Sequence, residues 1–246
     1  MRFRALPAAV VLSAAGLLVT PGLVSPAAAE STTIQAQPLD SGPVATKVKA
    51  APGGSAQTVD IDRHGSQLRT EGTETKASKT LEVDYQVQET GYWCGPAATR
   101  IALSARISPP SQADLAAQLG THEGGTDHIG QVTDVLNSNL GDGWYKTREM
   151  PNDPPSQEQK DLLWQDIVKD IDNNYPVVTN IVAPPGNQPP GYPSDQTIYH
   201  YFTVIGYDDA NNSVLIADSA NFGGNQIYWL SFDQLASLIP PKGYAA

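Results

Sequence analysis

A single cysteine is the first residue of this sequence that could carry out chemistry. Cys94 lies in the segment 88–98, and the residues that follow it have the pattern of a helix whose first turn contains Pro96, a position where proline is tolerated. A thiol at a helix N-terminus faces unpaired backbone N–H groups and the positive end of the helix dipole, and both favour the nucleophilic thiolate. A buried, inert thiol is the alternative. We predict that Cys94 is a nucleophile.

A nucleophilic thiol needs a base, and His200 is the histidine best placed to supply one. It begins the apolar run 199–205, which has the composition of a strand, and strand alternation puts it on one face with Phe202 and Val204. An ionisable side chain at the end of a core strand fits a base that packing holds in place. A hydrogen-bonded core histidine without a catalytic role would show the same pattern.

The other three histidines fit simpler roles. His64 falls in a polar N-terminal stretch, and His122 and His128 lie in a glycine-rich segment beside acidic residues, where a metal site could form but a polar loop is the plainer interpretation. One cysteine also excludes a disulfide within the chain and a zinc site built on two or more cysteines. We therefore predict no cofactor and no metal.

Two further side chains could complete a site with Cys94 and His200. The run 208–212 predicts a turn between two strands, and a turn centred on residue 209 would pair 204 with 214, 202 with 216 and 200 with 218. Asp218 would then face His200 and orient its ring, whereas a slip of one residue would separate them. Gln88, six residues before Cys94, could donate its amide to an oxyanion beside the Cys94 backbone N–H.

Together these residues resemble those of the papain-like cysteine peptidases of the double-glycine, bacteriocin-processing group, cysteine peptidase family 39. The resemblance rests on Gln88, five intervening residues, Cys94-Gly95-Pro96-Ala97, the later strand with His200 and the strand with Asp218. It covers residues 81–246 and is closest in kind to the secreted single-domain branch. One departure is Ser219 after Asp218, where the transporter-linked members commonly have proline.

The resemblance implies a papain-like α+β fold, with N-terminal helices packed on a C-terminal antiparallel sheet. It implies that Cys94 is the nucleophile, His200 the general base and acid, Asp218 the residue that orients the histidine and Gln88 the oxyanion donor. The activity implied is hydrolysis of peptide bonds in a peptide or protein substrate.

Two other functions remain open at this point. One is an inactive peptide-binding module on the same fold, whose groove could be lined by Tyr92, Trp93 and Trp144. The other is a cell-wall peptide amidase, a class that also places a cysteine at a helix start and a histidine on a strand.

The elements that must position these residues occur as helices first and strands afterwards. Four helices are predicted. The first covers 95–106, the second runs from its cap Ser111 to Gly120, and the third covers 129–140 and ends at Gly141. The fourth follows Ser156, which begins an S-x-x-Q capping box. Strands are predicted at 177–182, 199–207, 214–217 and 226–230, and the five prolines of 184–197 predict a surface loop. Helices grouped before an antiparallel sheet are typical of an α+β fold.

Charge and the N-terminus limit the partners and the location. The 246 residues contain 26 acidic and 15 basic side chains, for a formal charge of −11, which speaks against nucleic acid or an anionic membrane as partner. Arg2 and Arg4, the apolar run 5–19 and the small residues 27–29 indicate a secretory signal peptide cut after Ala29. We expect a secreted, extracellular protein without a membrane span.

Residues 30–80 contain no aromatic residue and are rich in small and polar types, so we predict a disordered leader or propeptide there and a peptidase domain at 81–246. Gly53-Gly54 in this leader could be a site of self-cleavage, although two glycines in such a stretch are explained more simply by flexibility.

Overall fold

The computed structural model describes residues 77–246 and two short strands before them, β1 (Ile34–Gln35) and β2 (Thr46–Val48). The expected signal peptide, His64, Gly53-Gly54 and most of the expected leader lie outside the described residues, so those predictions and the division into three segments stay predictions. Within the described part, no helix has both the length and the apolar character that crossing a membrane requires.

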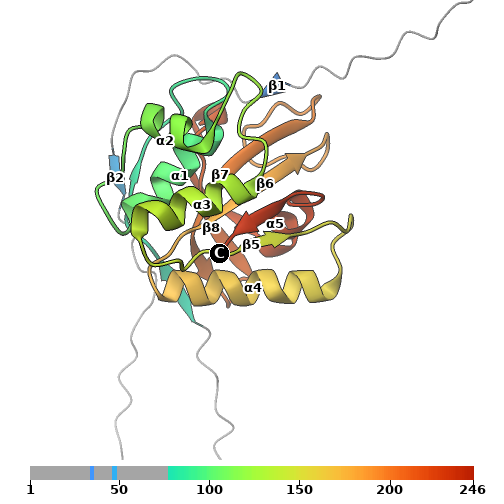
Figure 1. Cartoon of the computed structure of the whole chain (residues 1–246). Coiled ribbons are helices and arrows are strands. Elements are labelled where there is room, and N and C mark those ends of the chain that lie inside the picture. The colour runs from blue at the N-terminus through green and yellow to red at the C-terminus, as the bar shows by residue number, and fades with distance from the viewer. Residues whose placement is uncertain (1–33, 36–45, 49–76) are drawn as a thin grey trace, which may run out of the picture. The chain divides into compact units, whose positions relative to one another are not determined.

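An antiparallel sheet forms the centre of the domain (Figure 1). Its strands lie in the order β5 (Thr147–Glu149), β10 (Gly243–Ala245), β6 (Val177–Ala183), β7 (Ile198–Asp208), β8 (Ser213–Ala217) and β9 (Ile227–Ser231). β3 (Ser78–Thr80) pairs with the end of β7, β1 pairs in parallel with its start, and β4 (Val83–Tyr85) pairs with β2. The 11-residue β7 therefore organises the sheet, and it carries His200.

The helices among the described residues are α1 (Cys94–Ser104), α2 (Gln112–Leu119), α3 (Ile129–Leu140), α4 (Gln157–Asp172) and α5 (Phe232–Leu238), with a short 3-10 turn at Phe222–Gly224. The predicted signals at their ends are confirmed. Ser111 caps α2, and Gly120 and Gly141 end α2 and α3 in left-handed conformations with φ of 66° and 73°. Ser156 and Gln159 form the predicted capping box of α4.

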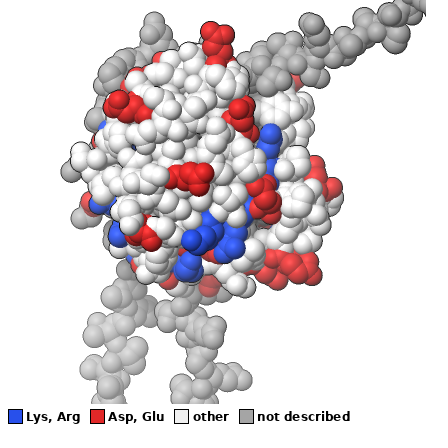
Figure 2. Space-filling model, in the orientation of Figure 1, with Lys and Arg blue, Asp and Glu red and all other residues white. Residues whose placement is uncertain are grey.

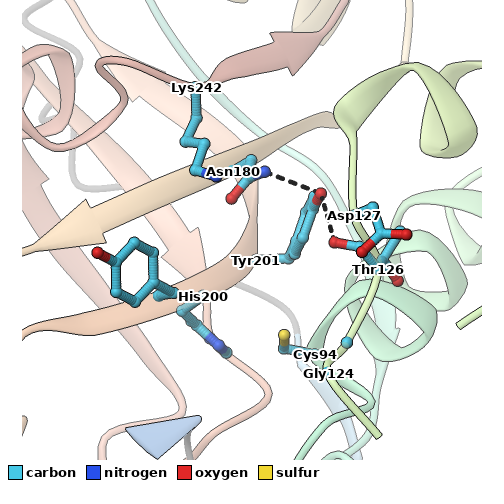
Figure 3. A pocket seen from close by; sticks show the side chains of 10 residues that line it. Cys94, Gly124, Thr126, Asp127, Asn180, His200, Tyr201 and Lys242 are labelled. Carbon is cyan, nitrogen blue, oxygen red and sulfur yellow. Dashed lines mark hydrogen bonds between the residues drawn. The ribbon is translucent and has the colours of Figure 1, made fainter. Parts of the chain in front are cut away.

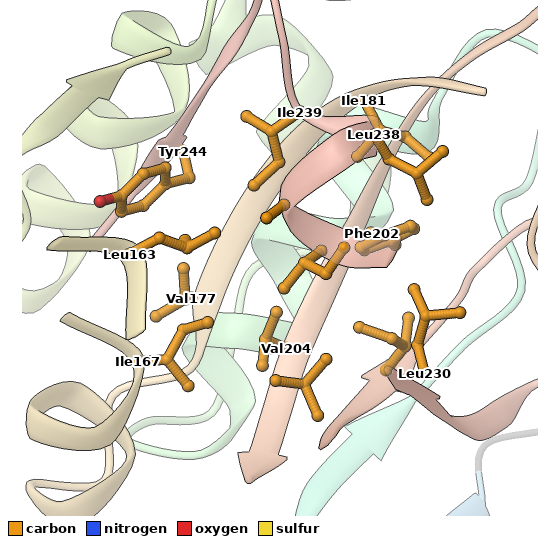
Figure 4. Packing of buried hydrophobic residues seen from close by; sticks show 14 of the residues in the cluster. Leu163, Ile167, Val177, Ile181, Phe202, Val204, Leu230, Leu238, Ile239 and Tyr244 are labelled. Carbon is orange, nitrogen blue, oxygen red and sulfur yellow. The ribbon is translucent and has the colours of Figure 1, made fainter. Parts of the chain in front are cut away.

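Alternate residues of the central strands bury two opposite faces. Val178 and Tyr201 pack with α1, α2 and α3, whereas Val177 and Phe202, their neighbours in sequence, pack with α4 and α5 (Figure 4). The predicted α+β class is confirmed, with helices on both faces of the sheet. α5 was not predicted from the sequence, although Ser231 caps it as Ser111 and Ser156 cap α2 and α4.

Most charged side chains lie at the surface. Figure 2 shows acidic side chains spread over the visible face, with one group of basic ones low on it and a few others toward its edges. Among the described residues, three carboxylates are buried instead, those of Asp166, Asp170 and Asp218. Arg148 pairs with Asp166 through Nε at 2.9 Å, whereas Asp218 belongs to the candidate site described next.

Candidate active site

Cys94 is the first residue of α1, and only 3% of it is exposed. The helix can begin here because Pro96 falls in the first turn, where its missing N–H has no helical partner to lose. The N-cap residue Trp93 makes no capping side-chain bond within the described structure, so the thiol lies beside helix N–H groups that no N-cap side chain occupies. Thr203 Oγ1 donates to the Ala98 carbonyl at 2.9 Å and ties α1 to β7, the strand of His200.

His200 is buried near the start of β7, with 1% of it exposed. Its Nε2 lies 2.8 Å from Asp218 Oδ1, and the nitrogen-bearing end of the ring faces the Cys94 sulfur in Figure 3. Burial by itself lowers the pKa of His200, but attraction to Asp218, the hydrogen bond with Asp218 and the proximity of Cys94 raise it more, from 6.5 to about 10. The site therefore favours the imidazolium form at neutral pH.

The contact between His200 and Asp218 forms in a register that differs from the predicted one. A turn centred on residue 209 would pair Val204 with 214, but Val204 pairs with Ile216, so the prediction was wrong by two residues. Because a slip by an even number keeps every side chain on its face, Asp218 still lies on the face of His200 and reaches it diagonally.

The turn and a bulge account for this shift. Asp208 Oδ1 accepts hydrogen bonds from the N–H groups of Ala210 and Asn211, which centres the turn beyond residue 209. Asp208 consequently pairs with Ser213 instead of 210, a shift of three positions. The bulge at Ile205 adds one residue to β7 and so reduces the shift in register from three positions to two.

Asp218 is completely buried, and four hydrogen bonds from described residues reach its carboxylate. His200 Nε2 and the Ala220 N–H (3.0 Å) hold Oδ1, and the hydroxyls of Tyr192 (2.6 Å) and Tyr228 (2.7 Å) hold Oδ2. Burial raises the pKa of this carboxyl, but the charge of His200 and the hydrogen bonds lower it more, so the pKa lies below its ordinary range. Neither tyrosine was predicted as a site residue; an aromatic residue among the prolines of 184–197 is the sequence signal for Tyr192.

Gln88 is buried beside the segment that follows Asp218. Its backbone N–H donates to the Ser219 carbonyl at 3.0 Å, and its Nε2 donates to the Thr90 carbonyl at 2.9 Å. These bonds fix the approach to Cys94 against the residues after Asp218. Gln88 is not among the residues that line the pocket beside the thiol, and its role as an oxyanion donor stays a prediction.

A pocket of about 190 Å³ lies beside the thiol (Figure 3). It is lined by Cys94, Gly124, Gly125, Thr126, Asp127, Asn180, Tyr199, His200, Tyr201 and Lys242. Asn180 Nδ2 donates to the Tyr201 hydroxyl at 2.8 Å, and that hydroxyl donates to the Thr126 carbonyl at 3.2 Å, so these hydrogen bonds connect β6, β7 and the loop before α3. Cys94 and His200 thus share one pocket, with Asp218 behind the ring.

Comparison with protein-family models matches residues 80–237 to the Peptidase C39 like family. The chain belongs to the peptidase C39-like family. The matched range contains Gln88, Cys94, His200 and Asp218. Comparison with curated proteins gave no match.

Three solved structures are similar to this C39-like chain. The peptidase domain of Streptococcus ComA, a bifunctional ABC transporter of a quorum-sensing pathway, is 21% identical, with a TM-score of 0.41 over 68% of this chain and 97% of that one. A putative C39-like peptidase from Bacillus anthracis is 14% identical, with a TM-score of 0.46 over 69% and 96%. Xylellain, a cysteine protease from Xylella fastidiosa, is 14% identical, with a TM-score of 0.39 over 76% and 92%.

The described histidines outside the pocket have structural contacts in this C39-like domain. His122 Nε2 lies 3.0 Å from Asp127, and its Nδ1 accepts from a neighbouring backbone N–H. His128 caps α3 by accepting from the Gly130 N–H, and its Nε2 lies 3.1 Å from Glu149. Among the described residues, no cluster of three or more potential ligands is arranged to hold a metal ion.

The aromatic residues considered for a binding groove also lie outside the lining of this pocket. Tyr92 and Trp93 contact each other edge to face at 6.4 Å, and Trp144 stacks on Tyr175 at 4.3 Å. Trp144 Nε1 donates to Asp170 at 3.0 Å, so this ring is held against α4.

Proposed function

We propose that this C39-like protein is a secreted cysteine peptidase that uses Cys94 as nucleophile, His200 as general base and acid, and Asp218 to orient the ring. The observation that carries the proposal is that Cys94 and His200 line one pocket while Asp218, buried behind the ring, holds the other ring nitrogen at 2.8 Å. This is the order of contacts that an activated thiol requires: nucleophile, base, orienting group.

Attack would start from a Cys94 thiolate paired with a His200 imidazolium. The raised pKa of His200 favours the form in which the proton resides on the ring. The sulfur forms a bond to the carbonyl carbon of the peptide, and the π electrons of the carbonyl move to its oxygen. We assign the backbone N–H of Cys94 and the amide of Gln88 as donors to that oxyanion.

Collapse of this intermediate breaks the C–N bond, and His200 gives its proton to the leaving amine, which leaves a thioester on Cys94. His200, now neutral, takes a proton from water as the water oxygen attacks the thioester carbon. The C–S bond then breaks, the acid product leaves, and thiolate and imidazolium are restored. The proposed cycle needs no cofactor and no metal.

The test uses the fact that Cys94 is the only cysteine of the sequence, so a thiol reagent reports on this residue alone. We expect the full-length protein to cleave an unfolded protein substrate such as casein and to lose this activity on alkylation with iodoacetamide. Cys94→Ala and His200→Gln should abolish hydrolysis, whereas His122→Gln, at an exposed histidine, should keep it. Hydrolysis that survives Cys94→Ala would refute the proposal.

The same experiment separates the other two functions. Saturable peptide binding without turnover in the wild type would show a binding module. Release of peptides from peptidoglycan by a protein that leaves casein intact would show a cell-wall amidase.

The location and processing are a separate part of the proposal. The basic start, apolar run and small residues up to Ala29 support export, and the mature protein should begin at Glu30 in the medium of the producing cell. N-terminal sequencing of wild type and Cys94→Ala tests self-processing, because a start at Ser55 in the wild type alone would show cleavage after Gly53-Gly54. Identical ends would reject it.

A further inference from the structure

Two tyrosine hydroxyls converge on one oxygen of the Asp218 carboxylate. Tyr192 lies 2.6 Å and Tyr228 2.7 Å from Oδ2, while the bond to His200 uses Oδ1. A phenol hydroxyl is a neutral donor, so these bonds stabilise the ionised carboxylate without neutralising it. The full negative charge remains available to the imidazolium on the other side.

Tyr192 is delivered to this position by the proline-rich loop 184–197. The loop touches the turn at Phe222 through Gly191, where a Cβ would lie 2.2 Å from the Phe222 carbonyl oxygen and where φ is +81°. The Tyr192 ring packs against Phe222 at 4.8 Å and against His200 at 6.0 Å. A loop that sequence predicts to lie on the surface therefore has two buried residues, Pro189 and Tyr192, and Tyr192 contacts the site.

Tyr228 comes from the other side, on the edge strand β9. It pairs with Ile216 on β8, two residues before Asp218, and the Asp218 N–H donates to the Gln226 carbonyl at 2.8 Å. A third tyrosine, Tyr85 on β4, donates to the main-chain carbonyl of Asp218 at 2.8 Å. Three separate elements thus fix the backbone and the carboxylate of one residue.

We infer that Tyr192 and Tyr228 are positioning residues that act through Asp218, holding its carboxylate ionised and aimed at His200 so that the thiol–imidazole pair stays in its reactive form. This inference rests on the proposed function and deepens it. It also gives loop 184–197 a role in the reaction, because the loop carries one of the two donors.

The two tyrosine hydroxyls should affect the pH dependence of the site. The bonds from the tyrosines lower the pKa of Asp218, so removing a hydroxyl must let the carboxyl take up a proton at higher pH. A protonated Asp218 no longer attracts the imidazolium, and the reactive pair is lost. The titratable groups around Asp218 are His200 on β7, Tyr192 on the loop, Tyr228 on β9, Tyr85 on β4 and, beyond the ring, Cys94 on α1.

The experiment measures the rate of iodoacetamide alkylation of Cys94 in the full-length protein between about pH 3 and about pH 9, a range chosen to contain the acid limb of the profile. It compares the wild type with Tyr192→Phe, Tyr228→Phe and the double variant. Tyr244→Phe is the matched control, because Tyr244 is also buried and its hydroxyl also donates to a buried carboxylate, Asp166, at 3.0 Å. Alkylation needs no substrate, and casein hydrolysis is measured in parallel.

We expect the acid limb of the alkylation-rate profile to move to higher pH by about one unit in each single variant and further in the double variant. The free energy of a hydrogen bond to a charged group corresponds to a pKa shift of about this size. Tyr244→Phe should follow the wild type. An acid limb that stays in place in either folded single variant overturns the inference. A second test removes no hydroxyl: 3-fluorotyrosine, incorporated at every tyrosine, makes the phenols stronger donors. The acid limb of the alkylation profile must then move to lower pH.

The parallel assay keeps the two proposals apart. Shifted alkylation limbs in a protein that cleaves no peptide would support the two positioning tyrosines and refute the peptidase. Hydrolysis with unmoved limbs would support the peptidase and refute the positioning role.

Discussion

Gly95 and Thr126 lie so close together that residue 95 has no room for a side chain: a Cβ there would be 2.2 Å from Thr126 Oγ1. Thr126 is itself held in place, because its Oγ1 bonds the Thr121 hydroxyl at 2.7 Å and its carbonyl accepts from Tyr201 at 3.2 Å. The residue directly after the proposed nucleophile therefore sets how closely the pocket wall approaches α1.

Gly95→Ala should consequently damage both stability and the site. Overpacking costs about 1–3 kcal/mol, which offsets or exceeds the roughly 1 kcal/mol that alanine gains over glycine inside a helix. We expect a lower midpoint of urea unfolding and slower alkylation of Cys94. The double variant Gly95→Ala, Thr126→Gly should recover the alkylation rate, and a single variant that matches the wild type in both measurements would show that this close contact is unimportant.

Asp218→Asn should move the alkaline limit of activity. The carboxylate charge raises the pKa of His200 to about 10 against the lowering effect of burial, so without it the pKa should fall below the ordinary 6.5. The imidazolium is then lost at neutral pH, and hydrolysis at about pH 8 should drop by at least about a hundredfold. Asp172→Asn is the control, because Asp172 accepts a tyrosine bond, from Tyr207, outside the pocket. Equal pH profiles for Asp218→Asn and the wild type would contradict the orienting role.

Local signals in the sequence were sufficient for α1 to α4 and for the two strands of the site. Caps and stops act over one turn, so Ser111, Ser156 and Gly141 mark helix ends wherever the helices pack. The apolar alternation around His200 likewise predicted β7 and the buried face that this side chain occupies.

Features that leave the apolar pattern unchanged, and pairings between distant segments, account for what was not predicted from the sequence. The register of β7 against β8 depends on a side-chain bond of Asp208 and a bulge at Ile205, and neither changes the apolar pattern. β10 is a three-residue strand that lies between β5 and β6, which no local pattern indicates. Tyr192 resembles any loop aromatic until the fold brings it to Asp218.

The imidazolium of His200 should also make folding stability depend on pH. Its folded pKa, about 10, lies above the ordinary 6.5, so its contribution is fully present below about pH 6.5 and is lost as the pH rises through 10. The unfolding free energy of the wild type relative to His200→Gln should therefore fall between these limits, by at most about 5 kcal/mol. Urea unfolding of both proteins at several pH values measures this difference. A constant difference would mean that the ring is not charged in the folded protein.

Arg148→Ala should destabilise the protein without affecting the site. Arg148 holds the buried Asp166 through Nε at 2.9 Å and Nη2 at 3.3 Å, and its loss leaves that carboxylate with the Tyr244 hydroxyl among the described donors. An unpaired buried charge costs about 2–4 kcal/mol, so the midpoint of urea unfolding should fall clearly. The pH profile of Cys94 alkylation should stay that of the wild type, because Asp166 lies on α4 and outside the pocket. The exposed pair of Lys160 with Asp233 is the comparison, and Lys160→Ala should cost less than about 1 kcal/mol. If the uncompensated charge is the cause, adding Asp166→Asn to Arg148→Ala should recover part of the stability, and a double variant less stable than Arg148→Ala would contradict this explanation.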